Sequence, residues 1–334
     1  MSNIKEVAKL AGVSITTVSM VLNNTNHKIS DQTRKKVLQA AEELDYRPNN
    51  IARSLVTKKS NSIMLVIPDL INPFFALLSN QLAIYAEELG YILYIYNSHN
   101  KIMDGKSFVD LIERNYIEAT LIVDRRVKNF DKKIIDKYNI VFLDEFDYGN
   151  DEVNIVTGDN EKGGYLAVQY LLDHGFRNIG LNIGPHDTPN STRRLSGALK
   201  CMIDNYIVYD PKNIIHGNYS FEGGFKAGEY LVERGVDSIF SFSDLSTYGI
   251  LNYFLKKGIR VPEDISIISY DNLPMNRVIS PKLTSVDQNI DEIAKLSIKM
   301  VDRLIKKKLT DKKILVSPKI VRGESVKESE EWKY

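Results

Sequence analysis

Two sets of side chains in this sequence have types and spacing that suit binding chemistry, and the first set follows Gly12. Its members are Ser14, Ile15, Thr16, Thr17 and Met20. Threonine hydroxyl groups can donate or accept hydrogen bonds at base edges or phosphates, whereas isoleucine and methionine offer only apolar contact, for instance with a thymine methyl group. Three short polar side chains that suit phosphate oxygens follow, and these are Asn23, Ser30 and Thr33. Phosphate contacts position a protein on a duplex without reading its sequence.

The second set could bind a small molecule. Phe74 and Phe75 follow an Asn-Pro pair at an expected strand-to-helix turn, where an aromatic face could stack on a sugar ring. The alternative is that both rings belong to the core, as aromatic side chains at the start of a helix usually do. Asp271 ends the apolar run ISIISYD, and Arg194 begins an expected helix after a polar loop. A carboxylate that accepts from hydroxyl groups and a guanidinium that donates suit a polyhydroxylated ligand. Each of these charges alone is more often a surface charge.

The first sixty residues contain helical patterns only. Ser14 can cap the second helix and Ser30 the third, and residues 23–28 form an expected loop between them. The apolar positions expected to face the interior are Ile4, Val7, Ala8 and Leu10 in the first helix, Val18, Val21 and Leu22 in the second, and Val37, Leu38, Ala41 and Leu44 in the third. This arrangement predicts a helix-turn-helix, whose second helix enters the major groove of DNA. The alternative is a three-helix subdomain that binds no nucleic acid.

The charge of the chain is unevenly distributed. Residues 1–60 contain ten Lys and Arg against five Asp and Glu, which gives +5, whereas the remaining residues contain 34 against 38, which gives −4. A basic module joined to a mildly acidic body favours a polyanionic partner for the module. A solvated helical surface would give the same imbalance.

From residue 62 onward, short apolar runs alternate with amphipathic helices. The expected strands cover 62–68, 91–97, 119–124 and 139–146 in one series and 178–184, 214–219, 238–244 and 265–271 in another. Helices are expected near 74–89, 104–114, 130–138, 160–174, 192–204, 221–234 and 246–257. This alternation predicts two doubly wound parallel sheets, so the fold class is an all-α N-terminal module plus a two-lobed α/β core. Ligands of such folds bind at the carboxyl ends of the strands, and two facing lobes form a cleft.

Over nearly its whole length, the chain resembles the lactose/galactose repressor (LacI/GalR) family. The matching segments are IKEVAKLAGVSITTVSMVLNN at 4–24, ISDQTRKKVLQAAEELDYRPNNIARSL from Ile29, IPDLINPFF at 67–75, GGYLAVQYLLDHGFRNIG at 163–180, RLSG at 194–197, VPEDISIISYDN at 261–272 and LTSVDQ at 283–288. The resemblance implies a periplasmic-binding-protein-like core and a sequence-specific DNA-binding regulator. Such a regulator is usually a repressor, and an effector bound between the lobes controls its operator affinity.

The segment RPNNIARSL at 47–55 resembles the family's hinge helix, which folds when two subunits lie side by side on an operator. The resemblance implies DNA contacts by Asn49, Ala52, Arg53 and Leu55. Leu55 would insert between base pairs in the minor groove, where the free-energy cost of unstacking the bases is offset because the duplex becomes kinked. Alternatively, Leu55 packs onto the core domain. Many family members have a basic or histidine side chain where this sequence has Met20, which cannot donate a hydrogen bond. That departure leaves the operator sequence open.

The resemblance also adds effector-binding positions to Phe74, Phe75, Arg194 and Asp271. These additional positions are Asn72, Asp144, Tyr219, Ser243 and Gln288. Ser243 departs from the asparagine or similar amide often found at its position, which puts ribose-like specificity in doubt. A carbohydrate is the expected effector, with a purine or a phosphosugar as alternatives.

Four expected domains follow. They are a helix-turn-helix domain at 1–47, a hinge helix and linker at 48–61, an N-terminal lobe at 62–158 with 289–315, and a C-terminal lobe at 159–288 with 316–334. We expect a homodimer bound to a double-stranded DNA operator. The tail ESVKESEEWKY at 324–334 lacks the apolar heptads that would join dimers into a tetramer.

We expect no catalytic residue, no metal site and no cofactor. The sequence has no glycine-rich nucleotide-binding motif, its five histidines lack metal-ligand spacing, and Cys201 has no partner for a disulfide. The N-terminus lacks the uninterrupted apolar core of a signal peptide, and the longest apolar runs are too short to span a bilayer. These features favour a cytoplasmic protein without a membrane partner.

Two other functions stay open. A phosphoprotein coeffector, as in carbon-control regulators, could replace the small molecule by docking at the basic run RLIKKK at 303–308, although a solvated helix end is the simpler interpretation. A solute-binding protein would require export, which the N-terminus does not favour.

Overall fold

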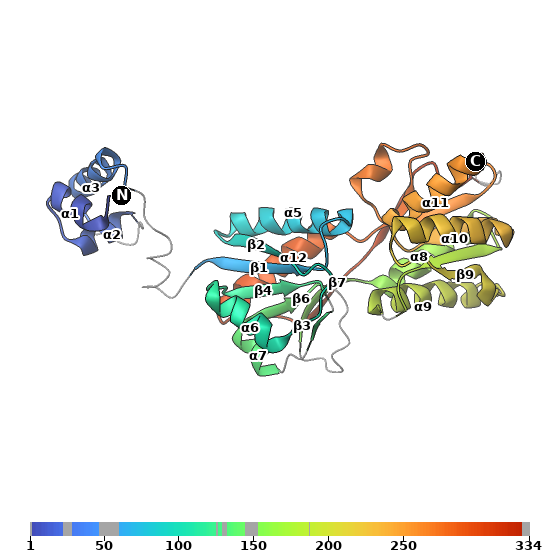
Figure 1. Cartoon of the computed structure of the whole chain (residues 1–334), viewed down its shortest axis with the longest axis horizontal. Coiled ribbons are helices and arrows are strands. Elements are labelled where there is room, and N and C mark those ends of the chain that lie inside the picture. The colour runs from blue at the N-terminus through green and yellow to red at the C-terminus, as the bar shows by residue number, and fades with distance from the viewer. Residues whose placement is uncertain are drawn as a thin grey trace. The chain divides into compact units, whose positions relative to one another are not determined.

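This computed structural model describes residues 2–22, 29–46, 60–124, 126–128, 132–143, 153–186 and 188–328. The chain divides into two compact units, Met1–Ser60 and Asn61–Tyr334. Both are drawn in Figure 1, where many of their elements are labelled. Within the described residues, we find no helix of the length and apolar character needed to cross a membrane.

The first unit is a bundle of short helices, α1 (Ile4–Ala11), α2 (Ile15–Leu22) and α3 (Asp31–Glu43). The side chain of Asn3 caps α1, and Gly12 ends it with a left-handed backbone at φ 64°, a conformation that glycine adopts without steric cost. The Ser14 hydroxyl accepts a hydrogen bond from the Thr17 amide (3.0 Å) at the start of α2. Ser30 caps α3 in the same way. The predicted helix-turn-helix is therefore confirmed.

Valine and alanine side chains form the core of this unit. The buried residues are Val7, Ala8, Val18, Val21, Val37, Ala40 and Ala41. Leu10 and Leu38, which the sequence analysis placed on the apolar faces, are 48% and 49% exposed, so that placement was wrong. Val37, Ala40 and Ala41 define the buried face of α3 by their i, i+3 and i+4 spacing, and Leu38 lies about 100° around the helix from Val37.

In the second unit, the first sheet has all its strands parallel, in the order β13-β7-β6-β4-β1-β2. Its strands are β1 (Ser62–Ile67), β2 (Ile92–Asn97), β4 (Ala119–Ile122), β6 (Ile140–Phe142), β7 (Asn154–Gly158) and β13 (Lys313–Val316). Helices α5 (Pro73–Glu88) and α12 (Ile290–Ile305) cover one face. Helices α6 (Gly105–Arg114) and α7 (Lys132–Lys137) cover the other, beside the short strands β3 (Met103–Asp104) and β5 (Val127–Lys128). We call this layered body the N-terminal lobe.

The second sheet has the order β14-β12-β11-β10-β8-β9, and only β14 is antiparallel to its neighbour. Its strands are β8 (Ile179–Ile183), β9 (Ile214–His216), β10 (Ser238–Ser241), β11 (Ser266–Asp271), β12 (Thr284–Asp287) and β14 (Lys319–Val321). Helices α8 (Asn160–Asp173) and α9 (Pro189–Asp204) cover one face. Helices α10 (Phe221–Glu233) and α11 (Asp244–Lys257) cover the other. Together with the 3-10 turns η1 (Pro211–Asn213) and η2 (Pro274–Arg277), this sheet forms the C-terminal lobe.

The chain passes between the two lobes at three places, which are β7 to α8, β12 to α12 and β13 to β14. The predicted α/β fold class is confirmed, and each of the predicted strands overlaps an observed one. Among the described residues, six strands and one helix were not predicted, namely β3, β5, β7, β12, β13, β14 and α12. The missed strands have two to five residues each, which is too short for a clear apolar run.

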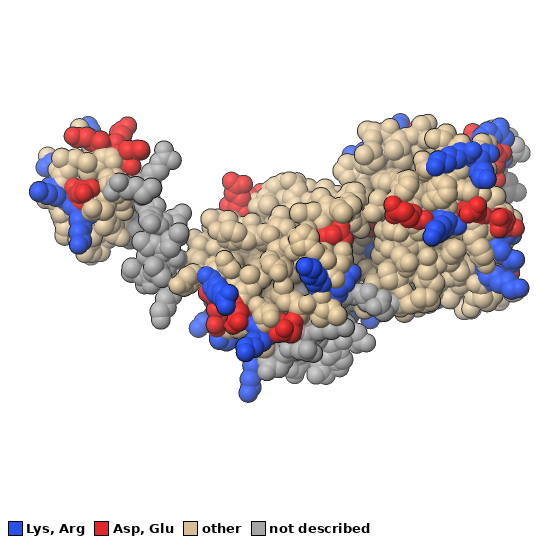
Figure 2. Space-filling model, in the orientation of Figure 1, with Lys and Arg blue, Asp and Glu red and all other residues tan. Residues whose placement is uncertain are grey.

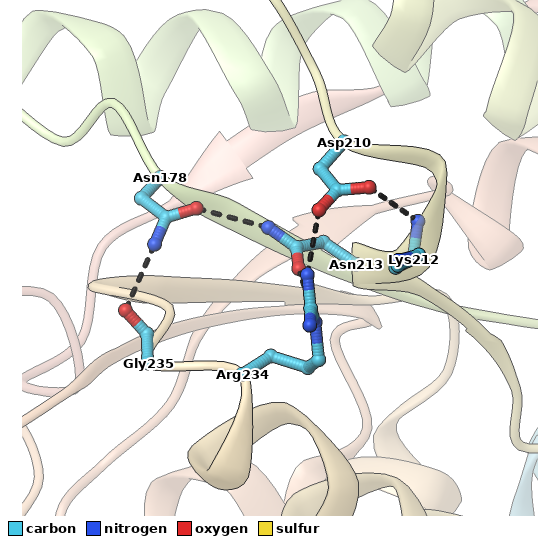
Figure 3. Close-up of polar contacts among 6 residues, drawn as sticks. All are labelled: Asn178, Asp210, Lys212, Asn213, Arg234 and Gly235. Carbon is cyan, nitrogen blue, oxygen red and sulfur yellow. Dashed lines mark hydrogen bonds and ion pairs between the residues drawn. The ribbon is translucent and has the colours of Figure 1, made fainter.

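A network of polar side chains lies at the amino ends of the strands in the C-terminal lobe, as Figure 3 shows. Arg234 forms an ion pair with Asp210 (2.6 Å) and donates to the side-chain oxygen of Asn213 (3.3 Å). Asn213 donates to Asn178 (2.9 Å), which in turn donates to the Gly235 carbonyl (2.8 Å). These bonds tie the segments before β8, β9 and β10 together.

We therefore expect Asn213→Ala to lower the free energy of unfolding by about 1–3 kcal/mol. Asn213 is buried, and its loss leaves donors and acceptors of the network without partners. Urea unfolding followed by circular dichroism measures the change. Lys212→Ala is the matched control, because only the backbone amide of Lys212 joins the network (2.9 Å to Asp210). An Asn213→Ala variant as stable as the control would contradict this role.

Candidate nucleic-acid interface and ligand cavity

Helix α2 exposes one side and buries the other. Ser14, Ile15 and Thr16 are exposed, whereas Val18 and Val21 are buried in the helical core. The hydroxyl groups of Ser14 and Thr17 lie 2.9 Å apart and share a hydrogen bond. Ile15 is 44% exposed at the amino-terminal end of α2. An apolar side chain beside a threonine hydroxyl is thus presented at the helix end that meets base edges in a helix-turn-helix.

The remaining predicted DNA contacts fall partly outside the described residues. Thr17 and Met20 are half-buried on α2, and Thr33 is half-buried on α3, where its hydroxyl shares a hydrogen bond with Ser30 (2.9 Å). The predicted contacts Asn23, Asn49, Ala52, Arg53 and Leu55 lie outside the described residues. On the face of this unit that Figure 2 shows, acidic side chains gather at one end and basic side chains toward the other.

A cavity lies between the two lobes of the second unit. Every described residue of the predicted effector set lines it, namely Asn72, Phe74, Phe75, Arg194, Tyr219, Ser243, Asp271 and Gln288. Asp144, the remaining member, lies outside the described residues. Thr157 and Asn190 also line the cavity and were not predicted. Residues far apart in the sequence are therefore brought to one place.

The N-terminal lobe contributes an aromatic wall. The side chain of Asn72 caps α5 by accepting from the Phe74 amide (3.0 Å), and Pro73 occupies the first turn. This start fixes the rings of Phe74 and Phe75 in an edge-to-face pair with centroids 5.4 Å apart. Both rings line the cavity while packing partly against the core, so the two alternatives for these rings are compatible.

The C-terminal lobe contributes a buried guanidinium. Arg194 is 4% exposed and donates to the side chain of Asn160 (2.8 Å) and the carbonyl of Phe242 (2.5 Å). Its guanidinium carbon lies 3.7 Å from the centroid of the Tyr270 ring. Arg194 lies six residues into α9, which begins at Pro189, so the expectation that it starts the helix was wrong.

Two glycines allow α8 and α9 to pack closely enough to place Arg194. A Cβ atom on Gly164 would lie 2.0 Å from the Arg194 carbonyl oxygen, and one on Gly197 would lie 1.8 Å from that of Glu161. Any side chain at either position would push the helices apart. The GG and RLSG segments therefore have a steric role in positioning the guanidinium.

Asp271 ends β11 with a strained backbone. Its φ is 113°, a region that residues with a side chain seldom adopt and that tends to occur at functional sites. Its carboxyl group accepts from the side chain of Gln288 (2.6 Å) and from the Asp244 amide (3.4 Å). Burial, followed by the nearby Asp244 carboxylate, raises the pKa of Asp271 above its ordinary value, while Arg194 and Gln288 act in the opposite direction.

Asp244, at the start of α11, is a buried acid that the sequence analysis missed. It accepts hydrogen bonds from the Leu273 amide (2.7 Å), the Asn276 side chain (2.9 Å) and the hydroxyl groups of Ser269 (2.5 Å) and Ser285 (3.2 Å). Burial raises the pKa of Asp244, and these donors oppose the shift. Its signal in the sequence was the one used for Asp271, an acid at the end of an expected strand.

Two further predicted residues complete the cavity wall. Ser243 caps α11 by accepting from the Ser246 amide (3.3 Å), so its hydroxyl group also has a structural role. The hydroxyl of Tyr219 donates to Asn190 (3.3 Å), and Tyr219 has a positive φ of 55°. The wall thus combines stacked rings, a guanidinium, a carboxyl group and amides, a donor and acceptor set that suits hydroxyl groups.

Residues 3–49 match the family model for bacterial regulatory proteins of the lacI family, and residues 168–326 match the model for a periplasmic binding protein-like domain. The HTH-type transcriptional repressor PurR of Pasteurella multocida is 30% identical over 332 residues, covering 98% of this chain and 99% of that repressor. The chain belongs to the LacI family. Its members are transcription regulators, and this chain is a repressor with a DNA-binding module and a ligand-binding domain.

Solved structures of transcription regulators agree with the observed fold. The complex of the transcriptional regulator CelR with cellobiose is 25% identical, covers 97% of this chain and 100% of that one, and has a TM-score of 0.70. The lac repressor dimer bound to operator and the anti-inducer ONPF is 24% identical, covers 97% and 98%, and has a TM-score of 0.83, which shows the shared fold. Among the described residues, no three His, Cys, Asp or Glu side chains group as metal ligands would.

We expect Asp271→Asn to reduce the pH dependence of stability. Because the pKa of Asp271 is raised in the folded state, the folded protein retains a proton that the unfolded chain has released above about pH 4. The free energy of unfolding should therefore fall as the pH rises above about 4, by up to about 1.4 kcal/mol per pH unit for each such proton. Urea unfolding at several pH values measures this slope.

The control for this experiment is Asp110→Asn, an exposed acid on α6. It should leave the slope of stability against pH as in the wild-type chain. Equal slopes for wild type and Asp271→Asn would show that the buried carboxyl group does not titrate as argued.

Proposed function

We propose that this LacI-family repressor binds a neutral, polyhydroxylated molecule, a carbohydrate, in the cavity between its lobes and that this ligand controls its affinity for a DNA operator. The observation that supports the proposal best is the cavity wall, where the rings of Phe74 and Phe75 face the lobe that holds Asp271 and Arg194. An aromatic face suits the apolar face of a sugar ring, and a carboxyl group and an amide suit its hydroxyl groups. The CelR structure contains cellobiose.

The proposed control works through differential binding. A ligand that contacts both lobes favours the arrangement in which those contacts are made, and it can shift DNA affinity only by its difference in affinity between the two states. We propose that the resulting change at the dimer face alters the spacing of the segments at 48–61 and hence of the paired reading helices. In successive major grooves of a near-palindromic operator, the exposed Ile15 and Thr16 would meet base edges.

Each lobe carries exposed apolar side chains that suit a homodimer. Strand β2 lies at the edge of its sheet and exposes Ile92, Tyr94 and Ile95 by about half. The C-terminal lobe exposes Leu255 on α11 (78%) and Val278 after η2 (76%). Groups of exposed apolar side chains and an uncovered sheet edge are typical of protein interfaces. A second copy of this chain is the occupant we propose, as in the lac repressor dimer.

The central experiment selects bound fragments from the host genome and measures operator affinity by fluorescence anisotropy with and without sugars. We expect specific fragments and a change in affinity of about 5- to 150-fold with the effector sugar. Phe74→Ala should lose the sugar response while still binding the operator, because Phe74 lines the cavity in the second unit.

Leu309→Ala is the control for that variant, because Leu309 is 91% exposed and lines no part of the cavity. It should respond to sugar as the wild-type chain does. Specific operator binding that no sugar changes would refute the carbohydrate and point to a phosphoprotein coeffector. Weak, salt-sensitive binding to every duplex would refute the repressor mechanism itself.

The dimer has its own test. Light scattering should give a mass of about 76 kDa, twice the 38.0 kDa of the chain. Ile95→Asp and Leu255→Asp should each favour the monomer, because a charge would be buried in the interface, and should lower operator affinity by about 100-fold through the loss of the paired contact.

Ile203→Asp serves as the control, because Ile203 is 64% exposed on α9, outside the proposed surfaces. It should remain a dimer with wild-type operator affinity. If all three variants remain dimers, the interface lies elsewhere on the chain. A tetramer that persists in high salt would contradict the proposed dimer.

A further inference from the structure

The ligand cavity adjoins a second hollow. This outer hollow is larger than the cavity described above and more open to solvent. The residues that line both are Asn72, Phe75, Val123, Asn190 and Tyr219. Because they share these lining residues, the two spaces adjoin, and we call them the inner and the outer part of the cleft.

The two parts differ in their exposure to solvent. At the inner part, Arg194 and Asp271 are 4% and 5% exposed. The outer part is lined by Ile71, which is 88% exposed, and Phe221, which is 37% exposed. Ile71 comes from the N-terminal lobe, between β1 and α5, and Phe221 begins α10 of the C-terminal lobe. Each lobe therefore presents an apolar side chain to the outer part. A ring bound against both side chains would remove their apolar surface from water.

The charges of the outer part disfavour an anion. Its charged side chains are Asp69, Asp124, Arg126 and Glu222. Arg126 and Asp124 form an ion pair (3.3 Å), which leaves two carboxylates in excess. Asp69 accepts hydrogen bonds from the amides of Ile71 (2.9 Å) and Asn72 (2.8 Å), so it is fixed at this position. A phosphate group bound here would lose solvent beside these like charges, whereas the hydroxyl groups of an uncharged ring could donate to them.

We propose that the effector has two linked, uncharged rings, as in a disaccharide, with one ring in the inner part and the other in the outer part. The inner ring meets Phe74, Phe75 and the polar set around Asp271, and the outer ring lies between Ile71 and Phe221. This inference rests on the proposed function, because it specifies the size and charge of the carbohydrate. It excludes a sugar phosphate whose phosphate lies in the outer part.

The test is isothermal titration calorimetry of the full chain with a panel of probes. The panel contains cellobiose, maltose, lactose, trehalose and sucrose, the monosaccharides glucose, galactose and fructose, and glucose 6-phosphate. We expect at least one disaccharide to bind about tenfold more tightly than its component monosaccharides, because each ring buries its own surface. The sugar phosphate should bind no better than glucose.

Phe221→Ala separates the two parts of the cleft. It should weaken disaccharide binding by about fivefold to tenfold, the size of a lost ring contact, and leave monosaccharide binding within about twofold. Ile71→Ala gives the same comparison from the other lobe. The matched control is Tyr206→Ala, an aromatic side chain of the C-terminal lobe that is 95% exposed and lines neither part of the cleft.

The outcomes distinguish this inference from the function on which it rests. Monosaccharides that bind as tightly as disaccharides, or a Phe221→Ala variant that behaves as the control does, would overturn the two-ring ligand and leave the carbohydrate in place. Tighter binding of glucose 6-phosphate than of every neutral sugar would overturn the charge argument. If no sugar of either size binds, both the inference and the proposed carbohydrate effector fail.

Discussion

Two carboxyl groups, those of Asp244 and Asp271, lie buried side by side at the carboxyl ends of strands in the second sheet, and their desolvation constrains the rest of the C-terminal lobe. An unpaired buried carboxylate costs several kcal/mol, so donors must be supplied from the surrounding elements. Asp244 receives them from β11, β12 and the segment at η2, and Asp271 receives one from Gln288. The same bonds that satisfy these acids therefore hold the ends of several strands in register around the cavity.

This network also links the cavity to the surface. Asp271 lines the cavity and contacts the Asp244 amide, and the carboxyl group of Asp244 binds the amide of Leu273 and the side chain of Asn276. Asn276 also accepts from the hydroxyl of Tyr248 (2.9 Å) and lies within η2, beside the exposed Met275. A change at the cavity end of this network is thus carried by short, directional bonds to a segment at the protein surface.

Much of the fold could be predicted from the sequence, because it depends on patterns that are local. Apolar runs such as the one ending at Asp271 identified the longer strands, and serines before helical patterns identified the caps of α2 and α3. The wrong placement of Leu38 has a simple cause, since one residue changes a helical direction by about 100°. The short strands β13 and β14 follow from pairing with distant partners, which no local pattern contains.

The residues of the candidate site were harder to predict from the sequence than the fold. The acid at the end of a strand and the rings at the start of α5 carry a chemical signal, and they do line the cavity. Thr157 and Asn190 are ordinary residue types whose presence there depends on how the two lobes face each other. Arg194 was expected to offer donors to a ligand. In the structure it donates to Asn160 and Phe242, because close packing at Gly164 and Gly197 brings it among these residues.

The three passages of the chain between the lobes restrict how the two bodies can move. Each passage is short, since only Asp159 separates β7 from α8, residues 288–289 separate β12 from α12, and residues 317–318 separate β13 from β14. Three such short connections prevent the lobes from sliding past each other or moving apart. Rotation of one lobe relative to the other about these connections is the motion that remains easiest. They also make each lobe discontinuous in the sequence, so neither could be exchanged between proteins as a single uninterrupted segment. Exchange of one whole lobe between two such proteins would require the replacement of two separate segments.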